Sequence, residues 1–444
     1  MRLIIIFSML LCAFNLNAQN AKSITNEIDE YLNSAHKAYK FNGVALVYHK
    51  NEPLLNKGYG YSQIEEKIPN TTETKFPILS ITKTITASII LKLQDEKKLS
   101  VKDKLNKYFP EYPNGSKISI HHLITHSSGI YNYTADVGIE DSTLVNNPIS
   151  KDFVVNYFKD KPLDFRPGKY YSYNNSGYFL LGLIIEKVTG KLYETIVREY
   201  LFEPFKMSNS GFDFNGLPKN EKAQGYQFWN KNEAIPYKHY DSTFAYSAGS
   251  IYSTTSDLSQ WAKVVSNKQF LNPKTWELAF KPKIRNYGYG WEISKYFDKK
   301  YIKHSGGYPG FMSELIYYPN DELIIILLNN YGTYEQNVWS IGMGITSIVL
   351  GMPYDKWTIR NDNKIEVSKM QKHVGQYKSG KNRLEIKLVD DNLFLALPNS
   401  PDMRLLPENE NQYFLDNFNT RFDFNNGKLI LHEHGQNLEY IKQN

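Results

Sequence analysis

Two strongly apolar hairpin patterns lie far apart in this 444-residue chain, and they constrain the fold more than any other feature. The first joins residues 43–48 to residues 53–60, and the second joins residues 311–318 to residues 323–328. Helical patterns dominate the segment between them, so a sheet built from both hairpins must contain a long helical insertion. The sequence therefore predicts an α/β (α+β) domain in which an antiparallel sheet is flanked by helices.

The pattern changes near residue 374 to short alternating strands with frequent turns. We expect these strands at residues 383–389, 392–397, 403–406, 412–415, 421–424, 428–432 and 438–441. Closing the sheet removes exposed strand edges, so a small all-β barrel or sandwich is expected at 374–444. The first domain is expected at 19–355, and the polar stretch within residues 356–373 is predicted to be a linker.

Composition limits the class of protein. Hydrophobic residues make up 41% of the chain and charged residues 22%, which is enough apolar surface for a folded globular protein. The formal net charge of +6 is spread along the chain without a long run of one sign. A nucleic-acid partner is therefore not expected.

The N-terminus has the layout of a secretory signal. Arg2 precedes an apolar stretch, and cleavage after Ala18 would remove residues 1–18. The stretch is short for a membrane span, although an uncleaved anchor stays open as an alternative. The only cysteine, Cys12, lies inside it, so the mature protein would have no disulfide or thiolate metal site. We expect a secreted or periplasmic protein without a stable membrane span.

A serine and a lysine lie three residues apart at the start of a strongly apolar helix pattern. Ser80 would have backbone N–H groups beside it, and Lys83 would fall on the same helix face. Lys83 could accept the hydroxyl proton if burial keeps its amine neutral. The spacing alone is weak evidence, because Ser34 and Lys37 repeat it on an amphipathic helix. For Ser80 a catalytic and a structural interpretation both stay open at this point.

Two further segments point to catalysis. Residues 171–178 read Tyr-Ser-Tyr-Asn-Asn-Ser-Gly-Tyr before an apolar helix, and residues 303–311 read Lys-His-Ser-Gly-Gly-Tyr-Pro-Gly-Phe. With residues 80–83, they resemble in order and separation the motifs of the serine β-lactamase and penicillin-binding-protein superfamily. The likeness is specifically to the branch of class C β-lactamases, DD-peptidases and related esterases. It spans about residues 24–350, and residues 374–444 resemble the lipocalin-like modules attached to some members.

The resemblance implies a role for each motif residue. Ser80 would be the acylated nucleophile, and Lys83 its proton partner. Tyr173 would act with Lys83 as general base and then general acid, while Asn175 would hold Lys83 and the substrate amide. The backbone N–H groups of Ser80 and Gly307 would form the oxyanion hole.

The third motif, His304-Ser305-Gly306, would bind substrate from an edge strand. His304 stands where many β-lactamases have a lysine, which is similar to certain DD-peptidases and D-amino-acid peptidases. A histidine side chain is only partly charged near neutral pH, so we expect it to hold a carboxylate less firmly than a lysine would.

The second motif can be aligned in two frames. Ser172-Tyr173-Asn174 fits the pattern of class A enzymes, whereas Gly177-Tyr178 at the usual offset favours the frame that ends at Asn175. We therefore expect Asn175 rather than Asn174 to face the substrate.

Four other histidines could suggest a metal, but simpler interpretations are favoured. His122 and His126 have the H-x-x-x-H spacing without the glutamate of a helical zinc protease, so helix capping and turn contacts are expected. His432 and His434 are expected on one face of a terminal strand, where solvent exposure explains them. No metal and no cofactor are predicted.

Three classes of function fit these motifs. The first is an amide hydrolase or transpeptidase acting on D-amino-acid peptides, with weak β-lactam hydrolysis. The second is a carboxylesterase, and the third is a binding protein that keeps the pocket without catalysis. A β-lactamase stays open as a variant of the first class. The expected ligand is a small molecule or a peptide, with peptidoglycan as one candidate. The leaving group separates the first two classes, and loops determine it.

Overall fold

The computed structural model describes residues 21–135, 145–332, 338–398, 400–415 and 418–443. The chain forms two compact units: a central unit, Asn42–Tyr334, and a terminal unit that combines Met1–Phe41 with Glu335–Asn444. The expected signal segment, residues 1–18, lies outside the described residues. Within the described ranges, no helix combines the length and the apolar character needed to cross a membrane.

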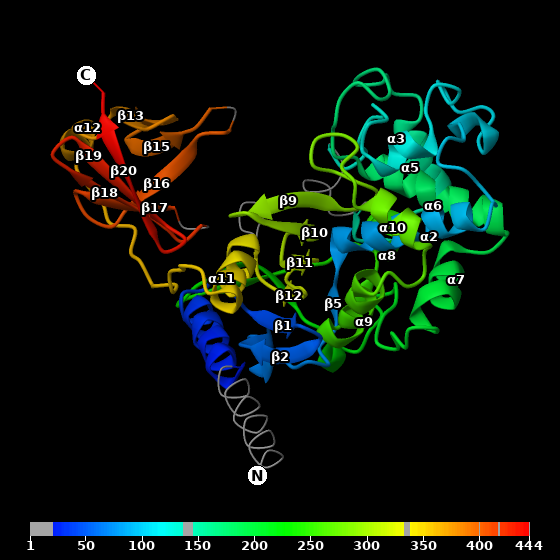
Figure 1. The fold of residues 1–444 in the computed structure, drawn as a ribbon, viewed down its shortest axis with the longest axis horizontal. Coiled ribbons are helices and arrows are strands. Elements are labelled where there is room, and N and C mark those ends of the chain that lie inside the picture. Colours follow the sequence, from blue (N-terminus) through cyan, green and yellow to red (C-terminus); the bar gives the residue numbers. More distant parts are fainter. Residues whose placement is uncertain (1–20, 136–144, 333–337, 399, 416–417, 444) are drawn as a thin grey trace, which may run out of the picture. The chain divides into compact units, whose positions relative to one another are not determined.

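A six-stranded antiparallel sheet is the frame of the central unit (Figure 1). Its order is β2-β1-β12-β11-β10-β9. The strands are β1 (Gly43–His49), β2 (Glu52–Tyr59), β9 (Glu292–Tyr296), β10 (Lys299–Tyr308), β11 (Phe311–Tyr318) and β12 (Leu323–Asn329). Both predicted hairpins are confirmed, and they join where Gly43 of β1 pairs opposite Asn329 of β12. β10 carries the third motif, and its pairing with β9 runs only from Lys299 to Lys303.

Helices fill the chain between the hairpins, as predicted. The longest are α2 (Thr82–Asp95), α6 (Asn175–Thr189) and α9 (Thr255–Ser266). The others are α3 (Ile120–Ile124), α5 (Lys151–Phe158), α7 (Tyr193–Val197), α8 (Ser242–Ala245) and α10 (Pro273–Ala279). Short two-stranded pairs accompany them: β3 (Tyr61–Gln63) with β4 (Ile68–Pro69), β5 (Phe76–Pro77) with β8 (Tyr252–Ser253), and β6 (Gly225–Trp229) with β7 (Ala234–Tyr237).

α2 is buried on nearly all sides because it lies inside the central unit. Its residues Ile85, Ile89 and Leu93 are fully buried. They belong to one core cluster with Leu315 and Leu328 of the sheet. A helix buried in this way is held by packing from every side. The turn before it is therefore fixed firmly in space.

The terminal unit contains a closed eight-stranded barrel, which confirms the predicted all-β module. Its strands are β13 (Gly375–Ser379), β14 (Asn382–Val389), β15 (Asn392–Ala396), β16 (Met403–Pro407), β17 (Gln412–Leu415), β18 (Thr420–Asn425), β19 (Lys428–Glu433) and β20 (Gln436–Lys442). β13 is the strand that the sequence pattern did not indicate. Alternate residues such as Tyr413, Phe422 and Leu429 fill the interior and form a core separate from that of the central unit.

The rest of the terminal unit is held together in part by hydrogen bonds of aromatic side chains. It includes a helix over residues 21–37, α11 (Trp339–Leu350) and α12 (Val367–Gln371). Trp357 donates its indole N–H to the Tyr31 hydroxyl (3.0 Å), and Tyr354 donates to Glu27 (2.7 Å). Within the expected linker, Met370 of α12 contributes to the barrel core. Part of residues 356–373 is thus folded against the barrel.

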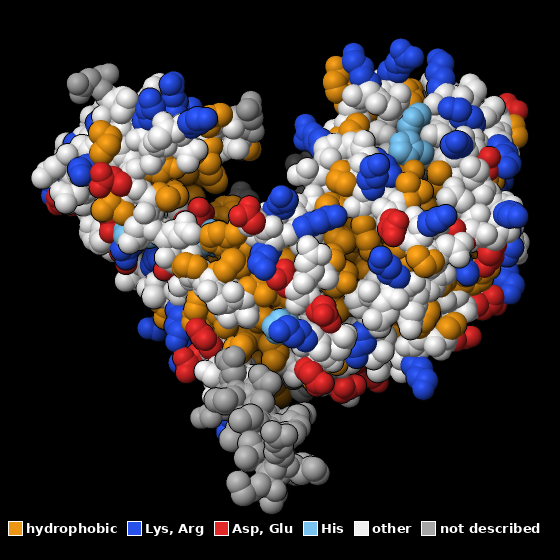
Figure 2. All heavy atoms as spheres, viewed as in Figure 1, with side chains coloured by type: hydrophobic (Ala, Val, Ile, Leu, Met, Phe, Trp, Pro, Cys, Tyr) orange, Lys and Arg blue, Asp and Glu red, His pale blue; other side chains and the backbone are white. Residues whose placement is uncertain are grey.

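Charged side chains of both signs are interspersed over the face shown in Figure 2. Surface ion pairs are frequent among the described residues, such as Lys191 with Glu199 (2.7 Å). Exposed pairs of this kind contribute little to stability. On this face the charges show no broad region of a single sign.

Candidate active site

Ser80 lies in a short 3₁₀ turn, Leu79–Ile81, immediately before α2. The turn is anchored by Ile78, whose N–H donates to Ile251 O (2.9 Å). Leu79 has a φ of 52°, a left-handed conformation that an ordinary side chain rarely adopts. Such strain persists only where surrounding packing imposes it, and it is frequent at functional sites.

Lys83 lies in the first turn of α2 and is buried next to Ser80. Its Nζ lies 2.9 Å from Ser80 Oγ and donates to Ala248 O at 2.7 Å. The side chain has no exposed surface, and burial lowers the pKa of Lys83 well below its ordinary value. A neutral amine with a free lone pair can accept a proton from the neighbouring hydroxyl.

Tyr173 approaches the same two residues from the segment before α6. The Lys83 nitrogen lies 4.9 Å from the centre of the Tyr173 ring. Burial raises the pKa of Tyr173 well above its ordinary value, and a hydrogen bond with Ser80 opposes part of that shift. The structure thus brings Ser80, Lys83 and Tyr173 together.

The two asparagines after Tyr173 have different surroundings. Asn174 is buried and caps α6, with Oδ1 accepting from Gly177 N–H at 2.7 Å. Asn175 faces the cavity beside Ser80, as the favoured frame predicts, but its Nδ2 donates to Thr134 Oγ1 (2.8 Å). The expected contact between Asn175 and Lys83 is not among the hydrogen bonds of the described residues.

His304 differs from the sequence-based expectation of a partly charged group. It is 1% exposed, and burial together with the nearby Lys83 lowers the pKa of His304 to about 3. Nδ1 lies 2.7 Å from Ser305 O, and Nε2 lies 3.0 Å from the Tyr287 hydroxyl. A carbonyl only accepts, so the neutral ring carries its proton on Nδ1 and accepts from Tyr287 through Nε2. The expectation of partial charge was wrong because it treated the side chain as solvated.

Ser305 points to the sheet face opposite His304, because side chains alternate along a strand. Its Oγ accepts from Lys303 Nζ (2.8 Å) and donates to Glu314 Oε1 (3.3 Å). Lys303 and Glu314 form a buried ion pair at 3.1 Å. The Ser305 side chain is therefore engaged away from the cavity.

Gly306 and Gly307 place β10 against the nucleophile turn. A Cβ on Gly306 would lie 2.6 Å from Ile78 O and 2.4 Å from Ser313 Oγ, so only glycine fits. Gly307 lines the cavity together with Ser80. The predicted oxyanion-hole residues therefore face one space.

That space is a cavity of about 300 Å³. Its lining residues are Leu79, Ser80, Tyr133, Thr134, Tyr173, Asn175, Tyr240, Phe244, Ala245, Ala248, Gly249, Gly307 and Tyr308. Among these described residues none is acidic or basic, and four aromatic rings other than Tyr173 form much of the wall. Such a lining suits an uncharged acyl group with an apolar side chain.

Two histidines, one in α3 and one just after it, form hydrogen bonds within the protein. His122 forms a capping box with Ser119 at the start of α3. His126 accepts the N–H of Asn174 through Nδ1 (3.0 Å). In the described part of the chain, no group of three or more histidine, cysteine or acidic side chains is arranged to hold a metal ion.

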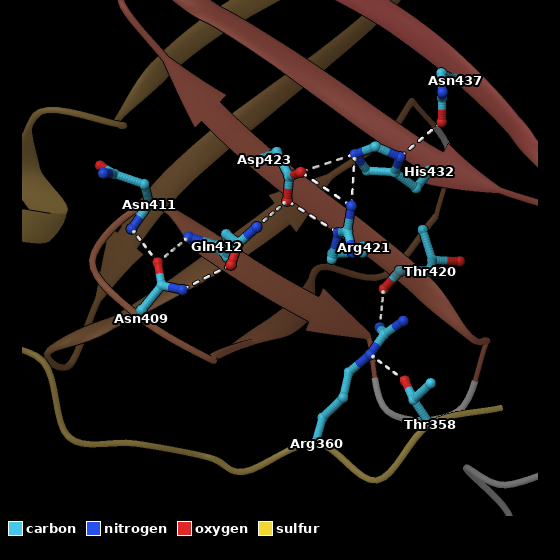
Figure 3. Close-up of polar contacts among 10 residues, drawn as sticks. All are labelled: Thr358, Arg360, Asn409, Asn411, Gln412, Thr420, Arg421, Asp423, His432 and Asn437. Atoms are coloured by element: carbon cyan, nitrogen blue, oxygen red, sulfur yellow. Dashed lines mark hydrogen bonds and ion pairs between the residues drawn. The ribbon is translucent and has the colours of Figure 1, made fainter.

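The barrel histidines do not share a strand face. His432 lies on β19 between Asp423 (2.9 Å) and Asn437 (2.6 Å), next to Arg421, as Figure 3 shows. His434 lies in the turn after β19 with a φ of 51°. Solvent exposure was therefore an incomplete interpretation for His432, which joins a polar network on the outer barrel surface.

Three residues around the site could not be identified from the sequence pattern. Thr134 holds Asn175, Tyr287 holds His304, and His126 contacts the segment of Tyr173. Each acts on a residue distant in the sequence. Only the tertiary fold brings these partners together.

Comparison with known proteins agrees with this geometry. The family model described as beta-lactamase matches residues 28–338. Penicillin-binding protein 4* of Bacillus subtilis is 26% identical over 96% of this chain and 99% of its own length. The teichoic acid D-alanine hydrolase of Staphylococcus aureus is 26% identical over 70% of this chain and 75% of its own length.

The similarity extends to the whole fold. The solved octameric penicillin-binding protein homologue from Pyrococcus abyssi superposes with a TM-score of 0.66 at 24% identity, covering 94% of this chain and 99% of that one. This coverage includes the barrel region as well as the central unit. The chain belongs to the β-lactamase family, within the serine β-lactamase and penicillin-binding-protein superfamily.

Proposed function

We propose that this chain is an exported serine hydrolase that cleaves amide bonds of D-amino-acid-containing peptides through an acyl-enzyme on Ser80. The observation that carries this proposal is the 2.9 Å contact between Ser80 Oγ and the fully buried amine of Lys83. A buried lysine with a lowered pKa beside a serine hydroxyl at a cavity wall is the arrangement that nucleophilic catalysis needs.

The reaction would proceed in two acyl transfers. Ser80 Oγ attacks the substrate carbonyl while its proton passes to Lys83, with Tyr173 sharing the proton. The tetrahedral oxyanion accepts hydrogen bonds from the backbone N–H groups of Ser80 and Gly307. Collapse breaks the C–N bond, and the leaving amine takes the proton. Water then attacks the seryl ester, and Ser80 regains its proton as the acid product departs.

The substrate assignment rests on relatives and on the cavity. One relative is named a penicillin-binding protein and another a teichoic acid D-alanine hydrolase. The aromatic wall, which includes Tyr133, Phe244 and Tyr308, suits an acyl group without charge. Export is proposed from the layout of residues 1–18.

A carboxylesterase on short-chain esters is the second candidate. The uncharged cavity lining favours it, because an ester needs no countercharge for binding. Acyl transfer to Ser80 would cleave an amide bond and an ester bond by the same steps. The two candidate functions differ only in the leaving group, an amine or an alcohol.

The test is acylation by a fluorescent penicillin, followed by intact-mass measurement. Wild type should gain one acyl group, while Ser80→Ala should gain none and retain a native melting transition. Ser34→Ala is the matched control, because Ser34 shares the motif spacing but donates to Tyr31 O and accepts from Trp357 N–H. Normal turnover by Ser80→Ala would disprove the nucleophile. Penicillin binding without a covalent adduct would favour a non-catalytic binding protein.

A further inference from the structure

Tyr173 lies between two peptide groups that are both held by one residue, His126. The N–H of Ser172 donates to His126 O at 2.9 Å, and the N–H of Asn174 donates to His126 Nδ1 at 3.0 Å. His126 follows α3, almost fifty residues earlier in the chain. One histidine thus fixes the backbone on both sides of the phenol that faces Ser80.

The protonation state of His126 follows from these contacts. Nδ1 must be unprotonated to accept from Asn174, so the neutral ring carries its hydrogen on Nε2. Burial, together with nearby Lys83 and His304, lowers the pKa of His126 well below its ordinary value. The ring therefore stays neutral, and it offers Asn174 a permanent acceptor.

The other ring nitrogen of His126 is unusual. Nε2 is buried and has no hydrogen-bond partner among the described residues. The ring is packed between aromatic neighbours, with centroid distances of 4.3 Å to Tyr173, 4.7 Å to Tyr287 and 5.0 Å to Tyr178. His126 also has a φ of 56°. An unpaired donor and a left-handed backbone are both unfavourable, and an apolar side chain would avoid the first.

We propose that His126 is a positioning residue that sets the phenol of Tyr173 over Ser80 and Lys83. It has no exposed surface and does not line the cavity, so it acts through Tyr173 rather than on substrate. The His126 ring packs against the Tyr173 ring and so fixes the position of the phenol. The two hydrogen bonds fix the backbone on either side of Tyr173. This inference rests on the proposed function, because it assigns His126 a role in acylation.

The test compares two replacements of His126. His126→Phe keeps a ring but removes the acceptor, whereas His126→Asn places Oδ1 near the position of Nδ1 and tolerates a positive φ. We expect the Phe variant to lose about 100-fold in kcat with little change in KM, since misplacement of a reacting group costs about that much. The Asn variant should recover at least a tenth of the wild-type kcat. His121→Phe, in the preceding helix α3, is the matched control.

A double-mutant cycle with Tyr173→Phe separates positioning from general destabilisation. If His126 acts through Tyr173, adding His126→Phe to Tyr173→Phe should reduce kcat no further. Multiplying losses would overturn the inference, as would a His126→Phe enzyme with wild-type kcat. Should His126→Phe fail to fold, His126→Gly removes the acceptor while suiting the positive φ, and the same loss is expected.

Parallel Ser80→Ala and Tyr173→Phe measurements keep the two proposals distinguishable. If either of these variants turns over substrate normally, the proposed function is at fault. If both lose turnover while His126→Phe retains it, only the role of His126 is wrong. Melting temperatures of all variants show whether a lost rate reflects unfolded protein.

Discussion

The backbone of Gly306 lies against the carbonyl group of Ile78, so closely that a Cβ on Gly306 would be 2.6 Å from that oxygen. The adjacent strand adds a second tie, because Ser313 Oγ donates to Ile78 O at 2.8 Å. The third motif and the nucleophile turn are therefore packed backbone to backbone. The close approach of Ile78 O leaves no room for a side chain at position 306, so glycine is required there.

Gly306→Ala should displace the turn that carries Ser80. We expect about a 100-fold loss of kcat/KM, because a shift of about 1 Å at a reacting group has that effect. Gly307→Ala should lose less, since its added methyl group would meet only the flexible end of Met312 at 3.3 Å. Steady-state kinetics on both variants would check this, and equal activity of Gly306→Ala and wild type would contradict it.

Lys83→Arg should fail to acylate despite its retained positive charge. A guanidinium cannot give up its proton at any pH compatible with folding, so it cannot accept the proton of Ser80. We expect a loss of about 10³-fold or more in the acylation rate. Lys92→Arg on the same helix is the control, because Lys92 is a partly exposed residue whose nearest ion pair, with Glu96, is 3.8 Å long. Stopped-flow labelling would measure both rates.

The acylation rate should rise with pH through the pKa of Lys83, which burial holds well below the ordinary 10.5. Only the neutral amine accepts a proton, so the rate falls on the acidic side. His304, with a pKa of about 3, stays neutral above about pH 5 and should add no inflection there. A profile of kcat/KM against pH would check this, and an acidic plateau would contradict it.

Stability should depend on Lys83 in the same direction. Between the lowered pKa of the folded state and the ordinary pKa of the unfolded state, the unfolded chain binds one more proton, so the free energy of unfolding rises with pH. Lys83→Met lacks this dependence. Its melting temperature should exceed that of wild type at neutral pH, by a margin that shrinks as the pH approaches the ordinary lysine pKa of 10.5.

Cephalosporin hydrolysis should be the slowest of three reactions, behind a D-Ala-D-Ala peptide and p-nitrophenyl butyrate. No lysine or arginine is among the described residues that line the cavity, and His304 is neutral, so a lactam carboxylate finds no countercharge. His304→Lys should raise lactam turnover relative to peptide turnover. Comparing kcat/KM on one preparation decides the order, and a dominant cephalosporin rate would overturn it.

A chain that ends at Arg360 should still be acylated at Ser80. The cavity-lining residues described here all lie upstream, and the barrel has its own core around Tyr413 and Phe422. Trp357, which bonds to Tyr31, is retained in this truncation. Substrate preference should change while labelling persists. Loss of labelling by a protein with a cooperative melting transition would show that the barrel completes the site.

The sequence predicted elements whose pattern is local. Alternating apolar residues such as Phe422 and Phe424 indicate a barrel strand, and the all-round apolar run after Ser80 indicates a buried helix. β13 was missed because Tyr377 is its only apolar residue between Gly375 and Ser379. The strand is completed by pairing with β14 and β20, which no local pattern reveals.

In the candidate site, too, local sequence motifs could be predicted and contacts made by tertiary folding could not. The motif residues could be identified because their spacing along the chain is characteristic of the family. The neutral state of His304 could not be predicted, because the pKa of this side chain is lowered by its burial and by nearby Lys83 in the folded chain. The contact of Ser305 with Glu314 could not be predicted either, because it follows from the register between β10 and β11.

The pairing of β1 with β12 also governs how the molecule is made. The first strand of the sheet, β1, can pair with β2 early, but it can pair with β12 only after residue 329 has left the ribosome. Until then the apolar segment Val44–Val47 has no partner on that side, and a nascent chain with such contacts folds slowly and is prone to aggregation. Protection of this early segment by a chaperone should therefore raise the yield of active protein without changing the finished fold.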